Sequence, residues 1–177
     1  LGYSMGGRVA LHAALAAPDR IRALVLIGAT AGIDDAAERA ARRAADEVLA
    51  AELASSGLDT FLDRWLAQPM FATLPTQAQH RAERLRNRTQ GLAASLRCCG
   101  TGTQRPLWAD VAGLATPTLA IAGGEDPKFT TLARRLTASI GPGATMALIP
   151  GAGHSVHLER PDETADAVLA FCADLAD

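Results

Sequence analysis

Several features that often decide a protein's class are scarce in this chain of 177 residues. The three cysteines are an odd number with an adjacent pair and no C-x-x-C spacing, which argues against a disulfide framework and a zinc site. We therefore expect a reducing, cytoplasmic compartment. No apolar run approaches the roughly 20 residues that a membrane-spanning helix needs. The formal charge of −2 gives no reason to expect nucleic acid or an anionic membrane as a partner.

Lysine is nearly absent, and the chain does not begin with methionine. Lys128 is the only lysine among 17 basic residues, and alanine is abundant. Nucleotide composition explains such a bias better than function does, so arginine abundance alone indicates nothing. The chain opens on Leu1 with no signal peptide, and we expect further residues upstream. The lack of a targeting signal is therefore uninformative.

What the chain does contain is the pattern of a globular α/β protein. Apolar residues make up 49% of it, enough for one domain with a real core. Apolar runs predict buried parallel strands at 22–28, 116–124 and 144–150. Helical segments are predicted at 8–17, 128–140 and 161–175. Residues 33–100 are helical, polar and rich in arginine, with no strand-like run.

Strand–helix units with a helical interruption predict an α/β fold that has a parallel sheet and a lid. Residues 1–32 are expected to supply the start of the core, with a sharp turn, a helix and the strand that follows. Residues 33–107 are expected to form the lid. Residues 108–177 are expected to complete the core, so that the lid is an insertion in one domain.

The chain begins with a motif for a nucleophilic serine. Residues 2–6, Gly-Tyr-Ser-Met-Gly, match G-x-S-x-G and precede a predicted helix. This spacing is typical of the nucleophile elbow of the α/β-hydrolase fold, where Ser4 would sit in strained backbone and the residues two positions away must be small. The amide of Met5 would be one oxyanion donor, with the second upstream. An ordinary turn serine is the alternative.

An acid and a base follow Ser4 in the order that this fold requires. Asp126 follows the strand predicted at 116–124, and His154 follows the strand predicted at 144–150. Both therefore lie at the carboxyl edge of the sheet, where parallel sheets bind ligands. His154 would take the proton of Ser4, while Asp126 would fix the imidazole tautomer and stabilise the cation. Glu125 as the acid and His157 as the base are the alternatives, with packing the favoured role for His157.

Longer stretches resemble one family, the 2-succinyl-6-hydroxy-2,4-cyclohexadiene-1-carboxylate synthases of menaquinone biosynthesis. The matching stretches are GYSMGGRVALHAAL, ERAARRAADEVLA, FLDRWLAQPMFA, RLRN, GLAASLRCCGTGTQRPLW, GGEDPKF and GAGHSVHLERP. They cover nearly the whole chain, and the lid stretches separate this family from other hydrolases better than the triad does. The resemblance implies the C-terminal portion of an α/β-hydrolase fold, with the first strands and an oxyanion loop upstream.

The resemblance implies a lyase that needs no metal or organic cofactor. The family removes a proton from 2-succinyl-5-enolpyruvyl-6-hydroxy-3-cyclohexene-1-carboxylate, electrons shift through the ring, and pyruvate leaves. His154 would activate Ser4 as the base, and no acyl-enzyme is required. The expected partner is a small polycarboxylate, and the sequence is silent on oligomeric state.

That substrate carries three carboxylates, which arginine binds well through paired hydrogen bonds. Family positions place substrate-binding side chains at Tyr3, Arg8, Arg42, Trp65, Phe71 and Arg86. Arg39 and Arg43 adjoin Arg42, and the sequence does not settle which of the three faces inward. Packing or solvent exposure is the alternative for each of these side chains. Arg134 and Arg135 are expected to face water.

Two other function classes remain open. A carboxylesterase or C–C bond hydrolase could carry the same triad, but an apolar lid would favour that function and this lid is rich in arginine. A non-catalytic binding protein is the second class, and an intact Ser/His/Asp set argues against it. The chain without upstream residues is expected to be inactive.

Overall fold

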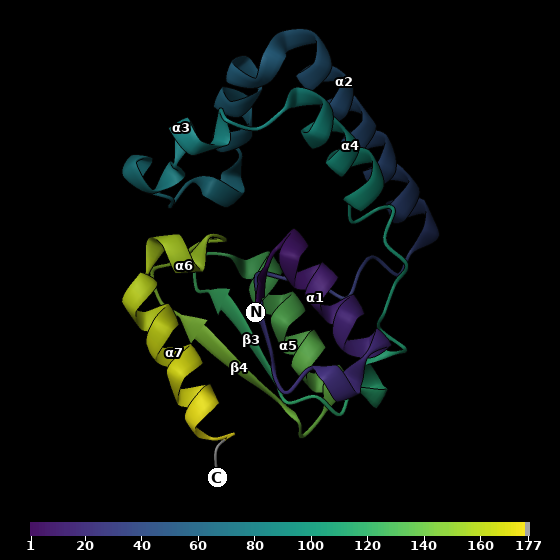
Figure 1. Cartoon of the computed structure of the whole chain (residues 1–177), viewed down its shortest axis with the longest axis vertical. Coiled ribbons are helices and arrows are strands. Elements are labelled where there is room, and N and C mark those ends of the chain that lie inside the picture. The colour runs from purple at the N-terminus through teal and green to yellow at the C-terminus, as the bar shows by residue number, and fades with distance from the viewer. Residues whose placement is uncertain (176–177) are drawn as a thin grey trace. The chain divides into compact units, whose positions relative to one another are not determined.

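The computed structural model describes residues 1–175, which form two compact units (Figure 1). The core unit consists of Leu1–Ala31 and of the chain from Leu107 onward, and the helical unit is Gly32–Pro106. The segment expected as a lid, 33–107, falls almost wholly in the helical unit, and its role as a cover over the site stays a prediction. Residues 176 and 177, the end of the expected C-terminal core, lie outside the described residues.

A parallel sheet of four strands is the centre of the core unit. Its strands, in spatial order, are β1 (Gly2–Tyr3), β2 (Leu24–Ile27), β3 (Thr118–Gly123) and β4 (Ala144–Ile149). The three strands predicted from apolar runs are confirmed, and β2 and β3 are buried along their whole length. The prediction of full burial is wrong for β4, because β4 lies last in this sheet and only Ile149 of it is buried.

Two helices cover one face of the sheet. These are α1 (Met5–Ala16) and α5 (Pro127–Ile140), both close to their predicted positions. Leu24 and Leu26 of β2 share an apolar cluster with residues of both helices. Since strand side chains alternate between faces, the next residues along β2 must point to the opposite side.

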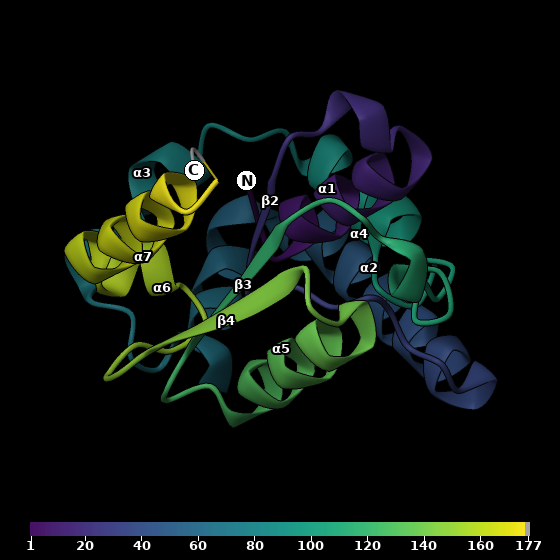
Figure 2. The same ribbon diagram turned by 90° about the horizontal axis from the view of Figure 1, so that it is seen from below.

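The opposite face is covered by α6 (Val156–Glu159) and α7 (Pro161–Ala173). Val25 and Ile27 of β2 pack there in a second cluster with residues of both helices. Figure 2 shows β3 and β4 between α5 on one side and α7 on the other. The core unit is therefore a three-layer structure, and its parallel sheet with flanking helices confirms the predicted α/β class.

The helical unit contains no strand among its described residues, as predicted. Its main helix, α2 (Ala36–Leu66), is capped by Asp35, whose side chain accepts a hydrogen bond from the amide of Glu38. A kink at Gly57, where φ is 80°, changes the direction of the helix. α4 (Thr89–Cys99) packs on α2 through a small apolar cluster, and α3 (Arg81–Arg84) is a short turn between the two in sequence. Within residues 1–175, no helix is long and apolar enough to cross a membrane.

Candidate active site

Ser4 lies in the tight turn between β1 and α1. Its φ of 49° and ψ of −110° lie outside the regions that non-glycine residues usually adopt, which confirms the predicted backbone strain. The Ser4 amide donates a 2.8 Å hydrogen bond to the carbonyl of Ile27 at the end of β2. The strained turn is therefore fixed to the neighbouring strand and not merely to its own helix.

Close packing around this turn restricts two glycines. A Cβ atom on Gly2 would lie 2.4 Å from the carbonyl oxygen of Gly6, and one on Gly7 would lie 2.7 Å from the Cβ of Ala29. A Cβ atom on Gly6 would meet no atom of the described residues within 4 Å. The expectation that Gly6 must be small does not hold among residues 1–175. The requirement falls on Gly2 and Gly7.

The loop after β4 brings His154 to Ser4. The imidazole Nε2 of His154 lies 3.1 Å from Ser4 Oγ, and Nδ1 lies 2.9 Å from Oδ2 of Asp126. Only 2% of His154 is exposed, so the ring makes these contacts out of bulk water. The three residues singled out from the sequence thus form one chain of hydrogen bonds from hydroxyl to imidazole to carboxylate.

Asp126 is held in place by the start of α5. It is the N-cap of that helix, so Oδ1 accepts a 3.0 Å hydrogen bond from the Phe129 amide while Oδ2 bonds His154. Burial alone would raise the pKa of Asp126, but the hydrogen bonds from His154 and Phe129, together with the charge of Lys128, hold it below its usual value. An ionised Asp126 favours a proton on Nδ1 of the imidazole. Nε2 is then available to accept the proton of Ser4.

Three groups surround the ring of His154. The ring centroids of Phe129 and Tyr3 lie 4.3 Å and 5.3 Å from that of the imidazole. The third is the backbone of Gly28, where an added Cβ would lie 2.9 Å from Cε1 of His154. Of these residues, only Tyr3 is predicted from the sequence to belong to the site. Phe129 and Gly28 carry a weak signal, since Phe129 merely follows a predicted strand and Gly28 merely ends one.

The alternatives for the acid and the base occupy different positions. Glu125 is exposed, and the carboxylate bonded to the imidazole belongs to its neighbour. His157 contacts the Tyr3 ring, 4.5 Å between centroids, and its buried Nδ1 has no hydrogen-bond partner among residues 1–175. Burial lowers the pKa of His157, the nearby His154 lowers it further, and Glu159 opposes this. A packing role against Tyr3 fits this environment.

Two of the predicted residues follow Ser4 on α1. Met5 is the first residue of the helix, so its amide lies at the N-terminus, where developing negative charge is favoured. Arg8 lies one turn later, and its amide donates a 3.1 Å hydrogen bond to the Ser4 carbonyl. Residues four apart share a helix face, which puts Arg8 on the same side of α1 as Ser4. Oxyanion donation by Met5 and carboxylate binding by Arg8 stay predictions.

Three neighbouring arginines of α2, in the helical unit, have different partners. Arg39 and Arg43 donate to backbone carbonyls of that unit. Arg42 instead bonds through Nε to Oδ1 of Asp46 at 2.9 Å, and Asp46 is only 2% exposed. The side chain of Arg42 is 40% exposed, and its terminal nitrogens have no partner among residues 1–175. Of the three, Arg42 therefore has the guanidinium that is best able to donate hydrogen bonds to a ligand.

Trp65, Phe71 and Arg86 are the other predicted pocket residues of the helical unit. Trp65 stacks on Phe61 with ring centroids 5.8 Å apart, and it contacts Phe71 at 6.1 Å. Phe71 is buried, whereas Trp65 remains partly exposed. Arg86 is exposed and has no ion-pair partner among the residues described. The two aromatic residues thus lie together, and the approach of all three to Ser4 stays a prediction.

The two arginines of α5 that were expected to face water differ from each other. Arg134 is exposed. Arg135 is also exposed overall, but its guanidinium lies over the ring of Trp108, 3.7 Å from the centroid. Such a contact with an aromatic face stabilises the packing of α5, so the expectation is incomplete for Arg135.

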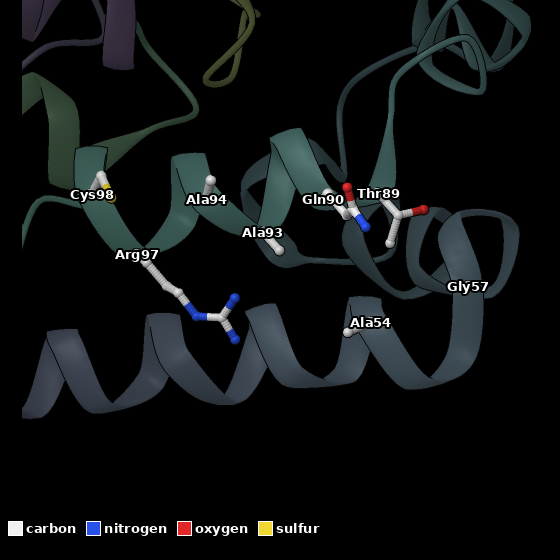
Figure 3. A pocket seen from close by; sticks show the side chains of 8 residues that line it. All are labelled: Ala54, Gly57, Thr89, Gln90, Ala93, Ala94, Arg97 and Cys98. Atoms are coloured by element: carbon white, nitrogen blue, oxygen red, sulfur yellow. The ribbon is translucent and has the colours of Figure 1, made fainter.

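A shallow groove of about 610 Å³ lies between α2 and α4 in the helical unit (Figure 3). Its lining is mostly small side chains, and its charged residue, Arg97, makes two 2.8 Å hydrogen bonds to Glu47. None of the predicted substrate-binding residues lines the groove, so it does not correspond to the predicted site. The described residues contain no group of three or more His, Cys, Asp or Glu side chains that could hold a metal ion.

Comparison with known proteins agrees with this geometry. A sequence model of the alpha/beta hydrolase family matches residues 1–167. The solved structure of MenH from S. aureus superimposes with a TM-score of 0.95 at 35% identity, covering 99% of this chain and 68% of that one.

Two curated relatives are similar over nearly the whole chain. The 2-succinyl-6-hydroxy-2,4-cyclohexadiene-1-carboxylate synthase of Serratia proteamaculans (strain 568) is 33% identical over 180 residues, 99% of this chain and 65% of the relative. A Bacillus subtilis (strain 168) protein assigned the same activity is 38% identical over 166 residues, 91% of this chain and 60% of the relative. The chain thus spans less than two thirds of the length of either relative. It belongs to the alpha/beta hydrolase family and, within it, to the family of 2-succinyl-6-hydroxy-2,4-cyclohexadiene-1-carboxylate synthases.

Proposed function

We propose that the protein is a carbon–oxygen lyase of the menaquinone pathway. It eliminates pyruvate from 2-succinyl-5-enolpyruvyl-6-hydroxy-3-cyclohexene-1-carboxylate and forms 2-succinyl-6-hydroxy-2,4-cyclohexadiene-1-carboxylate. The observation that carries the proposal is the hydrogen-bonded chain of Ser4, His154 and Asp126, in a protein whose relatives are named as synthases of that product.

In this reaction His154 and Ser4 act together as the base. Nε2 of His154 accepts the hydroxyl proton while Oγ of Ser4, 3.1 Å away, takes the proton from the substrate ring. The electron pair of that C–H bond forms a ring double bond, the double bond already in the ring shifts by one position, and the C–O bond to the enolpyruvyl group breaks. The imidazolium returns a proton to the leaving enolate, which becomes pyruvate. Atoms balance without water and without an acyl-enzyme.

Charge that develops during these steps has nearby stabilising groups. Asp126 holds the imidazolium through the 2.9 Å hydrogen bond to Nδ1. The amide of Met5, at the N-terminus of α1, offers a hydrogen bond and a favourable helix dipole to negative charge on the substrate. This arrangement supports proton transfer at Ser4, and the proposed steps need no metal ion.

The three carboxylates of the substrate match three arginines. Arg8 shares the helix face of Ser4, Arg42 has free terminal nitrogens, and Arg86 is exposed without an ion-pair partner among residues 1–175. Guanidinium groups bind carboxylates through two parallel hydrogen bonds, which supports these residues over any lysine. Tyr3 of the core unit, and Trp65 and Phe71 of the helical unit, are the aromatic side chains proposed to contact the substrate.

A cytoplasmic location belongs to the same proposal. Cys98, Cys99 and Cys172 are exposed and form no disulfide within residues 1–175, and exposed thiols outside disulfides suit a reducing compartment. We expect these thiols to stay reduced in the cell and to oxidise when the protein is purified without a reductant.

The assay that tests the proposal compares two reactions of the complete gene product. One is pyruvate release from the enolpyruvyl substrate, and the other is hydrolysis of a simple aryl ester. Pyruvate release that is lost in Ser4→Ala is the expected result. Fast ester hydrolysis without pyruvate release would overturn the lyase assignment and favour a carboxylesterase or C–C bond hydrolase.

A further inference from the structure

Glu159 is a buried carboxylate that the mechanism above does not use. It is the last residue of α6, and only 6% of it is exposed. Its Oε2 accepts a 2.7 Å hydrogen bond from the amide of Gly153, and its Oε1 accepts a 3.0 Å hydrogen bond from the amide of Ser155. These two amides are the ones directly before and after His154. One side chain therefore holds the backbone on both sides of the imidazole.

The chemistry of the side chain suits this contact. The amides of Gly153 and Ser155 precede the first turn of α6, so the helix itself gives them no partner. An ionised carboxylate offers two acceptor oxygens and no donor, and its hydrogen bonds are charge-assisted. A neutral amide of the same shape would turn an NH₂ group towards one of the two backbone N–H groups. The site thus requires the carboxylate and not simply a polar side chain of that size.

The other side of the same loop is fixed by β3. A Cβ atom on Gly123 would lie 2.2 Å from the carbonyl oxygens of both Ala152 and Gly153, so the loop lies directly against the end of the strand. The amide of Glu125 donates a 2.8 Å hydrogen bond to the Ala152 carbonyl. The loop is therefore held between the strand end and Glu159, and movement away from the strand is opposed by Glu159.

We propose that Glu159 is a positioning residue for His154: by binding the two flanking amides it sets the position of Nε2 relative to Ser4 Oγ. The proposal rests on the proposed role of His154 as the base for Ser4. It adds that the precision of that contact depends on a carboxylate five residues further along the chain. The imidazole's own partners, Ser4 and Asp126, fix its orientation but not the path of its backbone.

The test uses a serine-reactive fluorophosphonate on the complete gene product, because labelling of Ser4 requires activation by His154 whatever the natural substrate is. Glu159→Gln keeps the size of the side chain and should slow labelling about tenfold or more. The reason is that a displacement of a catalytic group by about 1 Å can lower the rate by up to about 100-fold. Glu163→Gln removes an exposed carboxylate of α7 and should change the rate less than about twofold.

A third variant separates positioning from general loss of stability. Val168→Ala truncates a side chain packed beside the second apolar cluster and should lower the melting temperature without slowing labelling. In parallel, the imidazole Nδ1 proton shared with Asp126 is observed by NMR, and it should shift or broaden in Glu159→Gln only. The pH at which labelling is half-maximal should also move in Glu159→Gln and in neither control.

The outcomes separate this proposal from the lyase assignment. Slower labelling in Glu159→Gln supports it even if the unmodified protein releases no pyruvate. Equal labelling and an unchanged Nδ1 signal in Glu159→Gln would overturn it, as would equal slowing in Val168→Ala. If the unmodified protein is not labelled, the Nδ1 signal decides alone, and an unchanged signal in Glu159→Gln again overturns the proposal.

Discussion

Gly28 and the imidazole of His154 are so close that a methyl group at position 28 would lie 2.9 Å from Cε1 and 3.2 Å from Nδ1. The φ of Gly28 is 55°, a conformation that L residues with side chains rarely adopt. The residue directly after β2 therefore serves two purposes. It turns the chain at the carboxyl edge of the sheet, and it leaves room for the ring that bonds Ser4.

Gly28→Ala should consequently displace the imidazole and strain the turn. We expect a loss of unfolding free energy of about 1–3 kcal/mol and a fall in Ser4 labelling and in pyruvate release of about tenfold or more. Gly143→Ala is the matched control, because an added Cβ there meets no described atom within 4 Å. Chemical denaturation and initial rates measure both effects. Equal behaviour of the two variants would mean that the contact with His154 is unimportant.

Ser4, His154 and Asp126 are expected to act as one unit, because each hydrogen bond of the chain is useful only if the other is present. Ser4→Ala and His154→Ala should each lower kcat by orders of magnitude. The double variant should cost little more than the worse single variant. Losses that multiply in the double variant would show that the residues contribute independently. Steady-state kinetics of pyruvate release gives the comparison.

The sheet and the order of the candidate triad could be predicted because their signals are local. A buried strand such as β3 is apolar at every position, and Asp126 and His154 directly follow predicted strands. The exposure of β4 could not be predicted, since burial of a strand depends on which elements lie beside it in space. Sequence shows the composition of a strand but not its neighbours.

The parts of the site that the sequence does not reveal depend on contacts between distant residues. The crowding expected at Gly6 occurs instead at Gly7, because the Cβ of Ala29 approaches that position from another strand end. Glu159 looks like one more charged residue before a helix until its burial and its two amide partners are known. The spacing of residues along the chain indicates neither fact. Ser4, by contrast, lies in a sequence motif that can be recognised without knowledge of its contacts.

Acidification should destabilise the core unit through His157. Burial lowers its pKa in the folded state, so the unfolded chain binds a proton more readily than the folded one does. The stabilising contribution is complete above the unfolded pKa of 6.5 and is lost as the pH falls from there towards the lower folded pKa. Denaturant unfolding from about pH 8 to about pH 5 should show this slope, and His157→Gln should flatten it.

Arg42 should show two separable effects. Arg42→Ala leaves the buried carboxylate of Asp46 without its partner, so stability should fall by about 1–3 kcal/mol after allowance for the partial exposure of the arginine. Adding Asp46→Asn removes the buried charge that has lost its partner, and it should restore much of that stability. It should not restore kcat/KM, because the proposed ligand of the substrate carboxylate is still missing. Recovery of kcat/KM in the double variant would indicate that Arg42 acts only through the packing of α2.

The arginines proposed to bind substrate should be distinguishable from those that are merely abundant. Arg8 shares a helix face with Ser4 and Arg86 is exposed in the helical unit, whereas Arg134 lies exposed on α5. Arg135 is unsuitable as a control, because its contact with the Trp108 ring makes its loss a packing change as well.

Arg8→Ala and Arg86→Ala should each lower kcat/KM roughly 30-fold or more, since a charged hydrogen bond to a bound carboxylate is typically worth about 2–5 kcal/mol and about 1.4 kcal/mol is tenfold. Arg134→Ala should change kcat/KM by less than about threefold, as surface substitutions usually do. Lysine at position 8 or 86 should restore only part of the loss, because a point charge cannot reproduce the two parallel hydrogen bonds of a guanidinium. If Arg8→Ala and Arg134→Ala gave the same kcat/KM, the arginines would be a product of composition alone, and a polycarboxylate substrate would lose its physical basis.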